Sequence, residues 1–157
     1  MPLRGRQSLK DQKVFFVTTT LKDHINLFNT CDKLNTLREI IKFCINKYNV
    51  VLYGYVLMTN HFHLLVRLEG GGPQLSSLMR EVKTYTRKKL FPDSKVIWMP
   101  RFDDVAIYSD EQFRIKLDYI HNNPVKAGLV LTPEEYEFSS ARNWLSGFED
   151  ELVSIDF

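Results

Sequence analysis

The sequence predicts an α+β domain built on an antiparallel sheet, and three observations support this. Runs rich in β-branched, aromatic and aliphatic residues alternate with two long segments whose apolar residues recur every three or four positions. Their order is strand, helix, strand, strand, helix, strand, and a further helix follows. Thr59-Asn60 forms a tight break between the two middle strands, which indicates a hairpin. This order is the split βαβ, ferredoxin-like pattern, with both main helices on one face and an added C-terminal helix.

Local composition sets the expected limits of each element. A helix is expected near 109–123, because Ser109 or Asp110 can cap it and Pro124 should stop it. Ser139 and Ser140 open a last short helix at 141–145. The fourth strand is expected from one of two short apolar pieces, 96–98 or 105–108. The remaining elements are expected as strands at 14–20, 50–57 and 61–68 and helices at 31–48 and 74–90.

Length and composition indicate one globular unit. The 157 residues are enough for a single domain with its own core, with a basic arm at 1–13 and an acidic tail at 146–157. The net charge of +2 does not by itself indicate a nucleic-acid partner, so local clusters must carry that argument. No apolar run reaches the roughly 18 residues of a membrane span, and no membrane partner is expected. Cys31 and Cys44 form no disulfide framework, which favours a cytoplasmic protein.

A pair of histidines stands inside the strand expected at 61–68. Alternate residues of a strand share a face, so His61 and His63 project together, roughly 6–7 Å apart along the backbone, while Phe62 turns into the core. Two imidazoles on one face can converge on a metal ion. The pattern alone is weak evidence, because each histidine could simply occupy a sheet surface.

The third expected helix supplies a second group of polar side chains. Tyr119 and Asn123 are four residues apart and therefore lie on one helical face. Packed over the open face of the sheet, that helix could bring both side chains above the histidines. An amide oxygen beside two imidazoles suits Mg²⁺ or Mn²⁺, and a phenol can act as a nucleophile on a phosphodiester. His121 and Lys126 are candidates to assist Tyr119.

The most basic region of the chain is a candidate DNA-binding surface. Lys and Arg residues gather on one side of the helix expected at 74–90, and more follow it. Such a cluster can follow a phosphate backbone, although a solvated helix face is an equally good interpretation. The residues expected to contact DNA are Lys83, Arg87, Lys88 and Arg101.

Two sequence blocks carry a family resemblance. The first is Met58-Thr59-Asn60-His61-Phe62-His63-Leu64-Leu65-Val66, and it resembles the Met-Pro-Asn-His-hydrophobic-His-Leu-Leu-Val motif of the single-tyrosine transposases of small bacterial insertion sequences. The second is Tyr119-Ile120-His121-Asn122-Asn123-Pro124-Val125-Lys126-Ala127-Gly128-Leu129-Val130, and it is similar to a block of the branch called REP-associated tyrosine transposases. Thr59 replaces the usual proline, and Phe138 replaces the Tyr or Trp that precedes the branch's Ser-Ser pair. The resemblance covers roughly residues 14–145.

The resemblance implies a function and a role for each matching residue. It implies metal-dependent cleavage of single-stranded DNA and strand transfer, with recognition of DNA hairpins. His61, His63 and Asn123 would hold Mg²⁺ or Mn²⁺, and Tyr119 would form a covalent 5′-phosphotyrosine. The resemblance leaves the assembly open between a homodimer, whose tyrosine serves its own or its partner's histidines, and a monomer, as in the REP-associated branch.

Three alternatives remain at this point. The chain could be a domesticated, non-mobile protein that binds DNA hairpins without strand transfer. It could be a histidine-based phosphoesterase, but that class would need a second His-x-Ser/Thr motif, which the sequence lacks. Tyr85 could replace Tyr119 as the nucleophile, although its apolar neighbours favour a core tyrosine.

Overall fold

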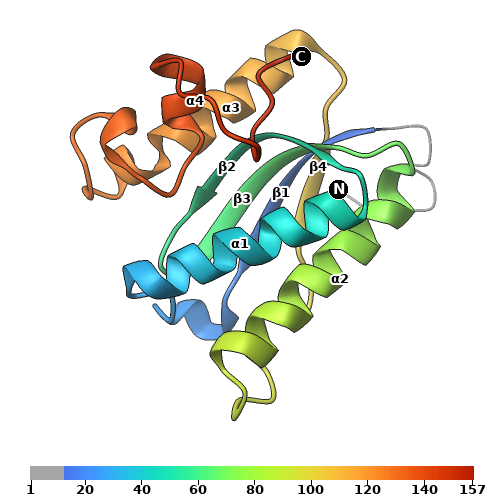
Figure 1. The fold of residues 1–157 in the computed structure, drawn as a ribbon, viewed down its shortest axis with the longest axis vertical. Coiled ribbons are helices and arrows are strands. Elements are labelled where there is room, and N and C mark those ends of the chain that lie inside the picture. The colour runs from blue at the N-terminus through green and yellow to red at the C-terminus, as the bar shows by residue number, and fades with distance from the viewer. Residues whose placement is uncertain (1–12) are drawn as a thin grey trace.

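The computed structural model describes residues 13–157, so the predicted basic arm lies outside the described residues except for Lys13. The fold is a four-stranded antiparallel sheet with helices packed on it (Figure 1). The elements, in chain order, are β1 (Val14–Thr20), the short 3-10 helix η2 (Lys22–His24), α1 (Cys31–Lys47), β2 (Val51–Leu57), β3 (His61–Arg67), α2 (Gly71–Leu90), β4 (Asp103–Ala106), α3 (Asp110–Lys126), the 3-10 helix η3 (Pro133–Glu135) and α4 (Ala141–Leu145).

The strand order confirms the expected fold. The order across the sheet is β2-β3-β1-β4, and each neighbouring pair is antiparallel. This is the ferredoxin-like arrangement that the sequence pattern predicts. The strands β1 and β3 are central, so the histidines of β3 lie in the middle of the sheet, next to the turn that leads into it from β2.

Alternation along the strands divides the core into two layers. Phe15 and Phe62 face α1 and α2 and belong to the larger apolar cluster. Phe16 and Leu65, one position out of phase on the same strands, face α3 and belong to the smaller cluster. Figure 1 shows α1 and α2 side by side across one face of the sheet, with α3 packed elsewhere. The two main helices therefore share a face, as predicted, and the added helix covers the other face.

Pro124 does not stop α3, contrary to the expectation from sequence. The helix passes through Pro124 and ends at Lys126. It closes with a Schellman motif, in which Gly128, at a φ of 75°, donates its N–H to Val125 and the N–H of Leu129 reaches the carbonyl of Pro124. A left-handed residue at this position favours glycine, and these bonds satisfy the carbonyls of the last turn. Pro124 removes one N–H from the last turn, but the bonds of the closing motif hold the end of the helix, and Asn123 keeps helical geometry.

The other limits agree with expectation to within a few residues. Thr30 caps α1 by accepting the N–H of Lys33. The helix α2 begins at Gly71, three residues before the expected start. The fourth strand comes from the second apolar piece, displaced to Asp103–Ala106, while Trp98 of the first piece makes one isolated bridge to Leu21.

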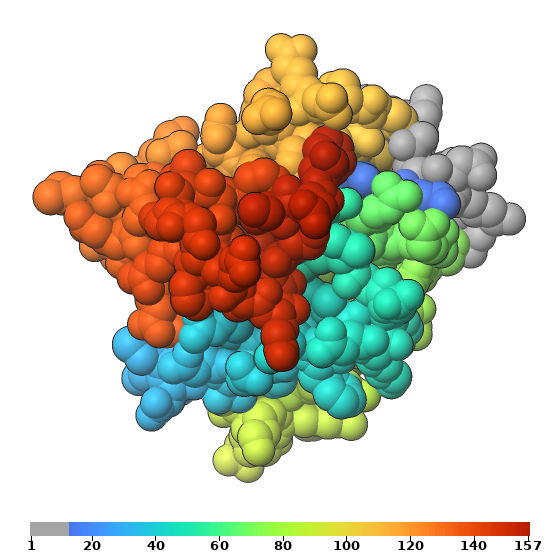
Figure 2. Space-filling model, turned by 45° about the horizontal axis from the view of Figure 1, so that its top comes forward, coloured from blue at the N-terminus to red at the C-terminus, as the bar shows by residue number. Residues whose placement is uncertain are grey.

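The outer edge of β2 is covered by the C-terminal residues. Leu57 donates its N–H to Phe138, Ser140 donates to Tyr55, and Ser154 donates to Leu52. Figure 2 shows these residues, orange to red, as a continuous mass against the blue and cyan residues of α1. The predicted acidic tail is thus partly bound to the sheet, although its sequence gave no structural signal. Within residues 13–157, no helix combines the length and hydrophobicity needed to span a bilayer.

Candidate active site

The face of the sheet under α3 carries both histidines. His61 and His63 lie at alternate positions of β3, and their ring centroids are 5.0 Å apart. Phe62 between them is fully buried in the opposite layer, where it packs against Trp98. The strand alternation expected from sequence therefore holds, and the packed phenylalanine anchors the segment that presents the two rings.

Each imidazole is oriented by a hydrogen bond at Nδ1. His63 Nδ1 lies 2.8 Å from Thr18 Oγ1, and His61 Nδ1 lies 2.7 Å from Asn60 Oδ1. The amide oxygen of Asn60 can only accept, so His61 carries its proton on Nδ1 and its lone pair on Nε2. The hydroxyl of Thr18 can accept from His63 Nδ1 in the same way. Oxygen partners of this kind are the usual support of metal-binding histidines. Both rings are therefore oriented as Nε2 ligands.

The environment keeps both rings neutral. Burial, the neighbouring His61 and the ammonium of Lys116 together lower the pKa of His63 to about 3. Burial, together with a charge on His24, also lowers the pKa of His61. Desolvation disfavours the charged imidazolium in each case. A neutral imidazole is the form that binds a metal, so the site needs no deprotonation step near neutral pH.

Asn123 lies against the histidines from the helix above. Its Nδ2 is 3.4 Å from His63 Nε2, and its side chain also hydrogen-bonds His61. Rotation of the amide by 180° exchanges its nitrogen and oxygen, which makes the carbonyl oxygen available at the same place. Because α3 continues through Pro124, the sequence expectation that this residue joins the two histidines agrees with the geometry.

Tyr119 lies beside His63, one helical turn before Asn123. The ring centroids of Tyr119 and His63 are 5.3 Å apart, in an edge-to-face arrangement. Phe16 of β1 stacks on His63 at 5.2 Å and meets Tyr119 edge-on at 5.9 Å, so one buried aromatic ring supports both. Tyr119 itself is 43% exposed, which leaves the phenol open to a substrate.

The two residues proposed to assist Tyr119 have different environments. Lys126 Nζ lies 5.9 Å from the centre of the Tyr119 ring. His121 is turned away and buried, with Nε2 2.8 Å from Ser140 Oγ, and burial lowers its pKa to about 4. A second lysine, Lys116, lies 4.8 Å from the centre of the Phe16 ring. The positive charge near Tyr119 therefore comes from two lysines of α3, one before it and one after it. His121 faces away from Tyr119 and has a structural role instead.

The donor set fits a divalent metal ion. Two neutral imidazole nitrogens and one amide oxygen converge, and their other polar atoms are already hydrogen-bonded. Among residues 13–157, no group of three or more His, Cys, Asp or Glu side chains could hold a metal.

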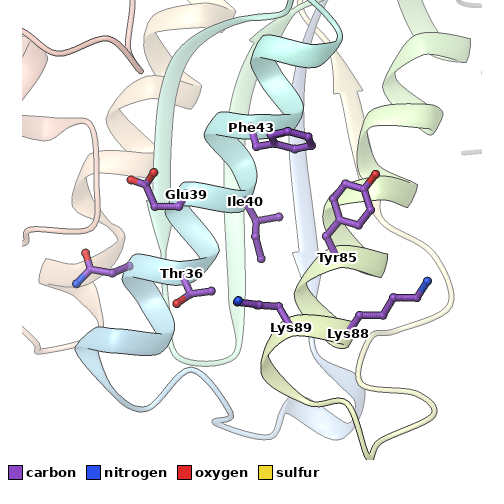
Figure 3. Close-up of a pocket in the computed structure, with 8 residues that line it drawn as sticks. Thr36, Glu39, Ile40, Phe43, Tyr85, Lys88 and Lys89 are labelled. Carbon is purple, nitrogen blue, oxygen red and sulfur yellow. The ribbon is translucent and has the colours of Figure 1, made fainter.

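The four basic residues expected to bind DNA do not gather in one place. Lys83 donates to the carbonyl of Met99 and Arg87 to that of Ser94, so both stabilise the loop before β4. Lys88 is exposed at the groove between α1 and α2, on the side of the sheet away from the histidines (Figure 3). Arg101 lines a cavity together with Thr18, the partner of His63. Of the four, Arg101 is the residue that a shared cavity connects to the histidines, through Thr18.

Tyr85, the alternative nucleophile, is on the wrong side of the sheet for these histidines. It belongs to α2 and packs against Phe43 of α1, with ring centroids 6.0 Å apart (Figure 3). The favoured interpretation of Tyr85 as a core tyrosine agrees with this contact.

Sequence reasoning missed three residues that support the site. Thr18 and Asn60 orient the histidines, and His24 lies close enough for its charge to act on His61. Asn60 directly precedes His61 in the chain, which was an available signal. Thr18 could be found only through its pairing with His63 across the sheet. His24 had no partner at a recognisable spacing.

The model of the family "Transposase IS200 like" matches residues 10–123, and the chain belongs to this family.

Two relatives and one solved structure that are similar to this chain carry the name REP-associated tyrosine transposase, one of them provisionally. A REP-associated tyrosine transposase of Escherichia coli K12 is 36% identical over 89 residues, 55% of this chain, and the match spans about half (51%) of that relative's length. A Haemophilus influenzae protein, provisionally given the same name, is 26% identical over 139 residues, 81% of this chain and 78% of its own. The solved structure of a REP-associated tyrosine transposase bound to a REP hairpin matches with a TM-score of 0.75 at 28% identity, covering 93% of this chain and 85% of that one.

Proposed function

We propose that this protein cleaves and rejoins single-stranded DNA through Tyr119, with the help of a divalent metal ion. The proposal rests on the position of Tyr119, whose exposed phenol lies next to two neutral imidazoles and an amide. The ring centroids of Tyr119 and His63 are 5.3 Å apart. Membership of a transposase family supports the same chemistry.

His61, His63 and Asn123 would hold Mg²⁺ or Mn²⁺, through the two Nε2 atoms and the amide oxygen. When bound, the ion would act as a Lewis acid that polarises a phosphoryl oxygen. The roles of Thr18 and Asn60 follow from their hydrogen bonds, since they fix the ring orientation that the ligands need.

Tyr119 would carry the covalent step. Its phenolic oxygen, after losing its proton, attacks the phosphorus of a phosphodiester, and the bond from phosphorus to the 3′-oxygen breaks. The 5′ side of the strand remains on the tyrosine, and the other side leaves with a 3′-hydroxyl. One phosphodiester replaces another, so attack by a 3′-hydroxyl can rejoin strands without an outside source of energy. Lys116 and Lys126 lie where they can offset the negative charge of the transferred phosphate.

The proposed substrate is single-stranded DNA next to a hairpin. The similar solved protein is a REP-associated tyrosine transposase bound to a REP hairpin, and its match covers 93% of this chain. Arg101 is the best-placed of the predicted DNA contacts, because it lines a cavity shared with Thr18. Lys83, Arg87 and Lys88 remain predictions, and they would act on DNA that extends past α2.

Tyr119 and the histidines of one chain are adjacent, so we propose that they act together in cis, whether or not the protein forms a homodimer. Mixing Tyr119→Phe protein with His63→Ala protein should then restore no cleavage. Recovery of cleavage in the mixture would contradict the cis arrangement and favour exchange of α3 between two copies.

A labelled hairpin oligonucleotide from the DNA flanking the native gene tests the proposal. With Mg²⁺ or Mn²⁺, the unsubstituted protein should give a covalent adduct on a denaturing gel. Tyr119→Phe and the double variant His61→Ala/His63→Ala should give none. Tyr85→Phe is the matched control, since it removes the same hydroxyl from the opposite face of the sheet, and it should react normally.

Two other results would change the proposed nucleophile or the proposed activity. An adduct that persists in Tyr119→Phe and disappears in Tyr85→Phe would move the nucleophile to α2. Tight hairpin binding with no cleavage in any metal would favour the domesticated, non-mobile binding protein.

A further inference from the structure

A cavity of about 480 Å³ opens next to the proposed active site, on its β4 side. Its volume falls within the range of small-ligand sites. The residues that matter for its chemistry come from β1, η2, the loop before β4 and β4 itself, and they are Thr18, Thr20, His24, Met99, Arg101 and Asp103.

Strand register makes this cavity continuous with the site. Thr18 lies between His63 on one neighbouring strand and Asp103 on the other, and Thr20 lies opposite His61. Directly paired residues of antiparallel strands point to the same face and are separated by about 4.5–5.5 Å between Cβ atoms. One row of side chains therefore runs from the histidines, across the threonines, to Asp103.

A strained turn supplies His24 to this cavity. Asp23 and His24 have φ values of 57° and 53°, a left-handed conformation that non-glycine residues adopt at a cost. The amide of Asn60 donates to the carbonyl of His24, while the Oδ1 of Asn60 meets the ring of His61. One side chain thus holds both the strained turn and a proposed metal ligand, which links the cavity wall to the site.

The cavity combines groups that a nucleotide requires. Arg101 can pair with a phosphate or with the acceptor edge of a base, and the carboxylate of Asp103 can accept from an exocyclic amino group. The hydroxyls of Thr18 and Thr20 add short polar contacts. Met99 and the ring of His24 offer surfaces on which a base can stack. A simple anion site would gain nothing from the carboxylate.

We propose that this cavity binds one unpaired nucleotide of the DNA strand, immediately next to the phosphate that Tyr119 attacks. The inference rests on the proposed cleavage function and adds a specificity site to it. Side chains of the protein would then determine, in part, which phosphate is cleaved. The carboxylate of Asp103 can accept from the exocyclic amino group of adenine, cytosine or guanine. The single N3–H of thymine lies between two carbonyl oxygens that repel a carboxylate, so the cavity should prefer the other three bases to thymine.

The test is a double-mutant cycle between protein and DNA. Binding is measured by fluorescence anisotropy with Tyr119→Phe as the parent protein, on hairpin oligonucleotides that carry an abasic nucleotide at successive positions around the mapped cleavage site. At one position next to the cleaved phosphate, loss of the base should weaken binding by about 5- to 100-fold. When Arg101→Gln or Asp103→Asn is added to the parent protein, the same abasic change should weaken binding by less than about twofold.

A matched variant controls for lost charge. Arg114 of α3 lines a different cavity, under Phe157, and Arg114→Gln should keep the full abasic penalty. An oligonucleotide with thymine at the sensitive position should bind the parent protein more weakly than one with cytosine. The two oligonucleotides should bind the Asp103→Asn variant equally well.

The outcomes separate the inference from the function. An adduct in the unsubstituted protein, with equal abasic penalties in the parent and in both cavity variants at every position, would overturn the nucleotide site alone. Absence of both adduct and hairpin binding would overturn the proposed function and this inference with it.

Discussion

Gly54 of β2 lies directly against side chains of α3, and its replacement by a larger residue should separate the sheet from that helix. A Cβ at this position would lie 2.7 Å from Leu117 Cδ1, 3.3 Å from Ser140 Oγ and 3.6 Å from Ile120 Cδ1. Ordinary carbon contacts lie near 3.5–4.0 Å, so α3 must move by roughly 1 Å or Leu117 must leave its rotamer. Overpacking of this kind costs about 1–3 kcal/mol, with Gly54→Val at the upper end and Gly54→Ala at the lower end.

The measurements are thermal unfolding and adduct formation on the same preparations. For a chain of this size, about 2–4 °C of melting temperature is lost per kcal/mol, so Gly54→Val should melt roughly 4–12 °C lower. Adduct formation should fall further than stability, up to about 100-fold, because Tyr119 is carried by the displaced helix. Leu117→Ala in the same chain should restore part of the adduct, although it costs stability itself. Gly54→Val protein with unchanged melting temperature and unchanged adduct yield would refute the reasoning.

Other substitutions test the remaining contacts. Thr18→Val keeps the shape of the side chain but removes the oxygen at His63 Nδ1, so Mn²⁺ affinity measured by calorimetry should fall about 10- to 100-fold; unchanged affinity would mean that the ring needs no such support. Burial lowers the pKa of His121 to about 4 in the folded protein, whereas an unfolded histidine titrates near 6.5. The free energy of unfolding should therefore be unaffected by His121 above about pH 6.5 and should fall by about 1.4 kcal/mol per pH unit as the pH drops from there to about 4. Urea unfolding at pH 7 and pH 5 should show that loss, and a His121→Gln variant with the same pH dependence would contradict it. Burial raises the pKa of Cys44 to about 11, while Cys31 is exposed, so iodoacetamide at pH 8 should add one group to the folded protein, as read by mass spectrometry of its peptides; labelling at Cys44 would show that the region opens.

Periodicity was sufficient for the parts of the site that belong to single elements. Alternation on β3 placed His61 and His63 on one face, and the four-residue spacing on α3 placed Tyr119 and Asn123 together. The expected stop at Pro124 was wrong, because local rules for proline omit what the end of a helix can gain from a closing motif.

Features that depend on pairing between distant segments could not be read from the sequence. The position of Thr18 between His63 and Asp103 exists only once three strands are in register. The pattern placed α2 on the face away from the histidines, but it did not place the loop that carries Arg101 beside Thr18, so Lys88 and Arg101 looked equivalent. The role of His24 depends on a left-handed backbone at a non-glycine residue, which local propensity disfavours.

The bonds that residues 138–154 make along β2 have a consequence for synthesis on the ribosome. Until those residues emerge, the outer edge of β2 presents unpaired N–H and C=O groups that another strand could join. Once they are in place, that edge is no longer open, and a second copy cannot extend the sheet there. Residues 138–154 therefore protect the sheet from strand exchange, and a chain cut short before residue 138 should be prone to aggregate.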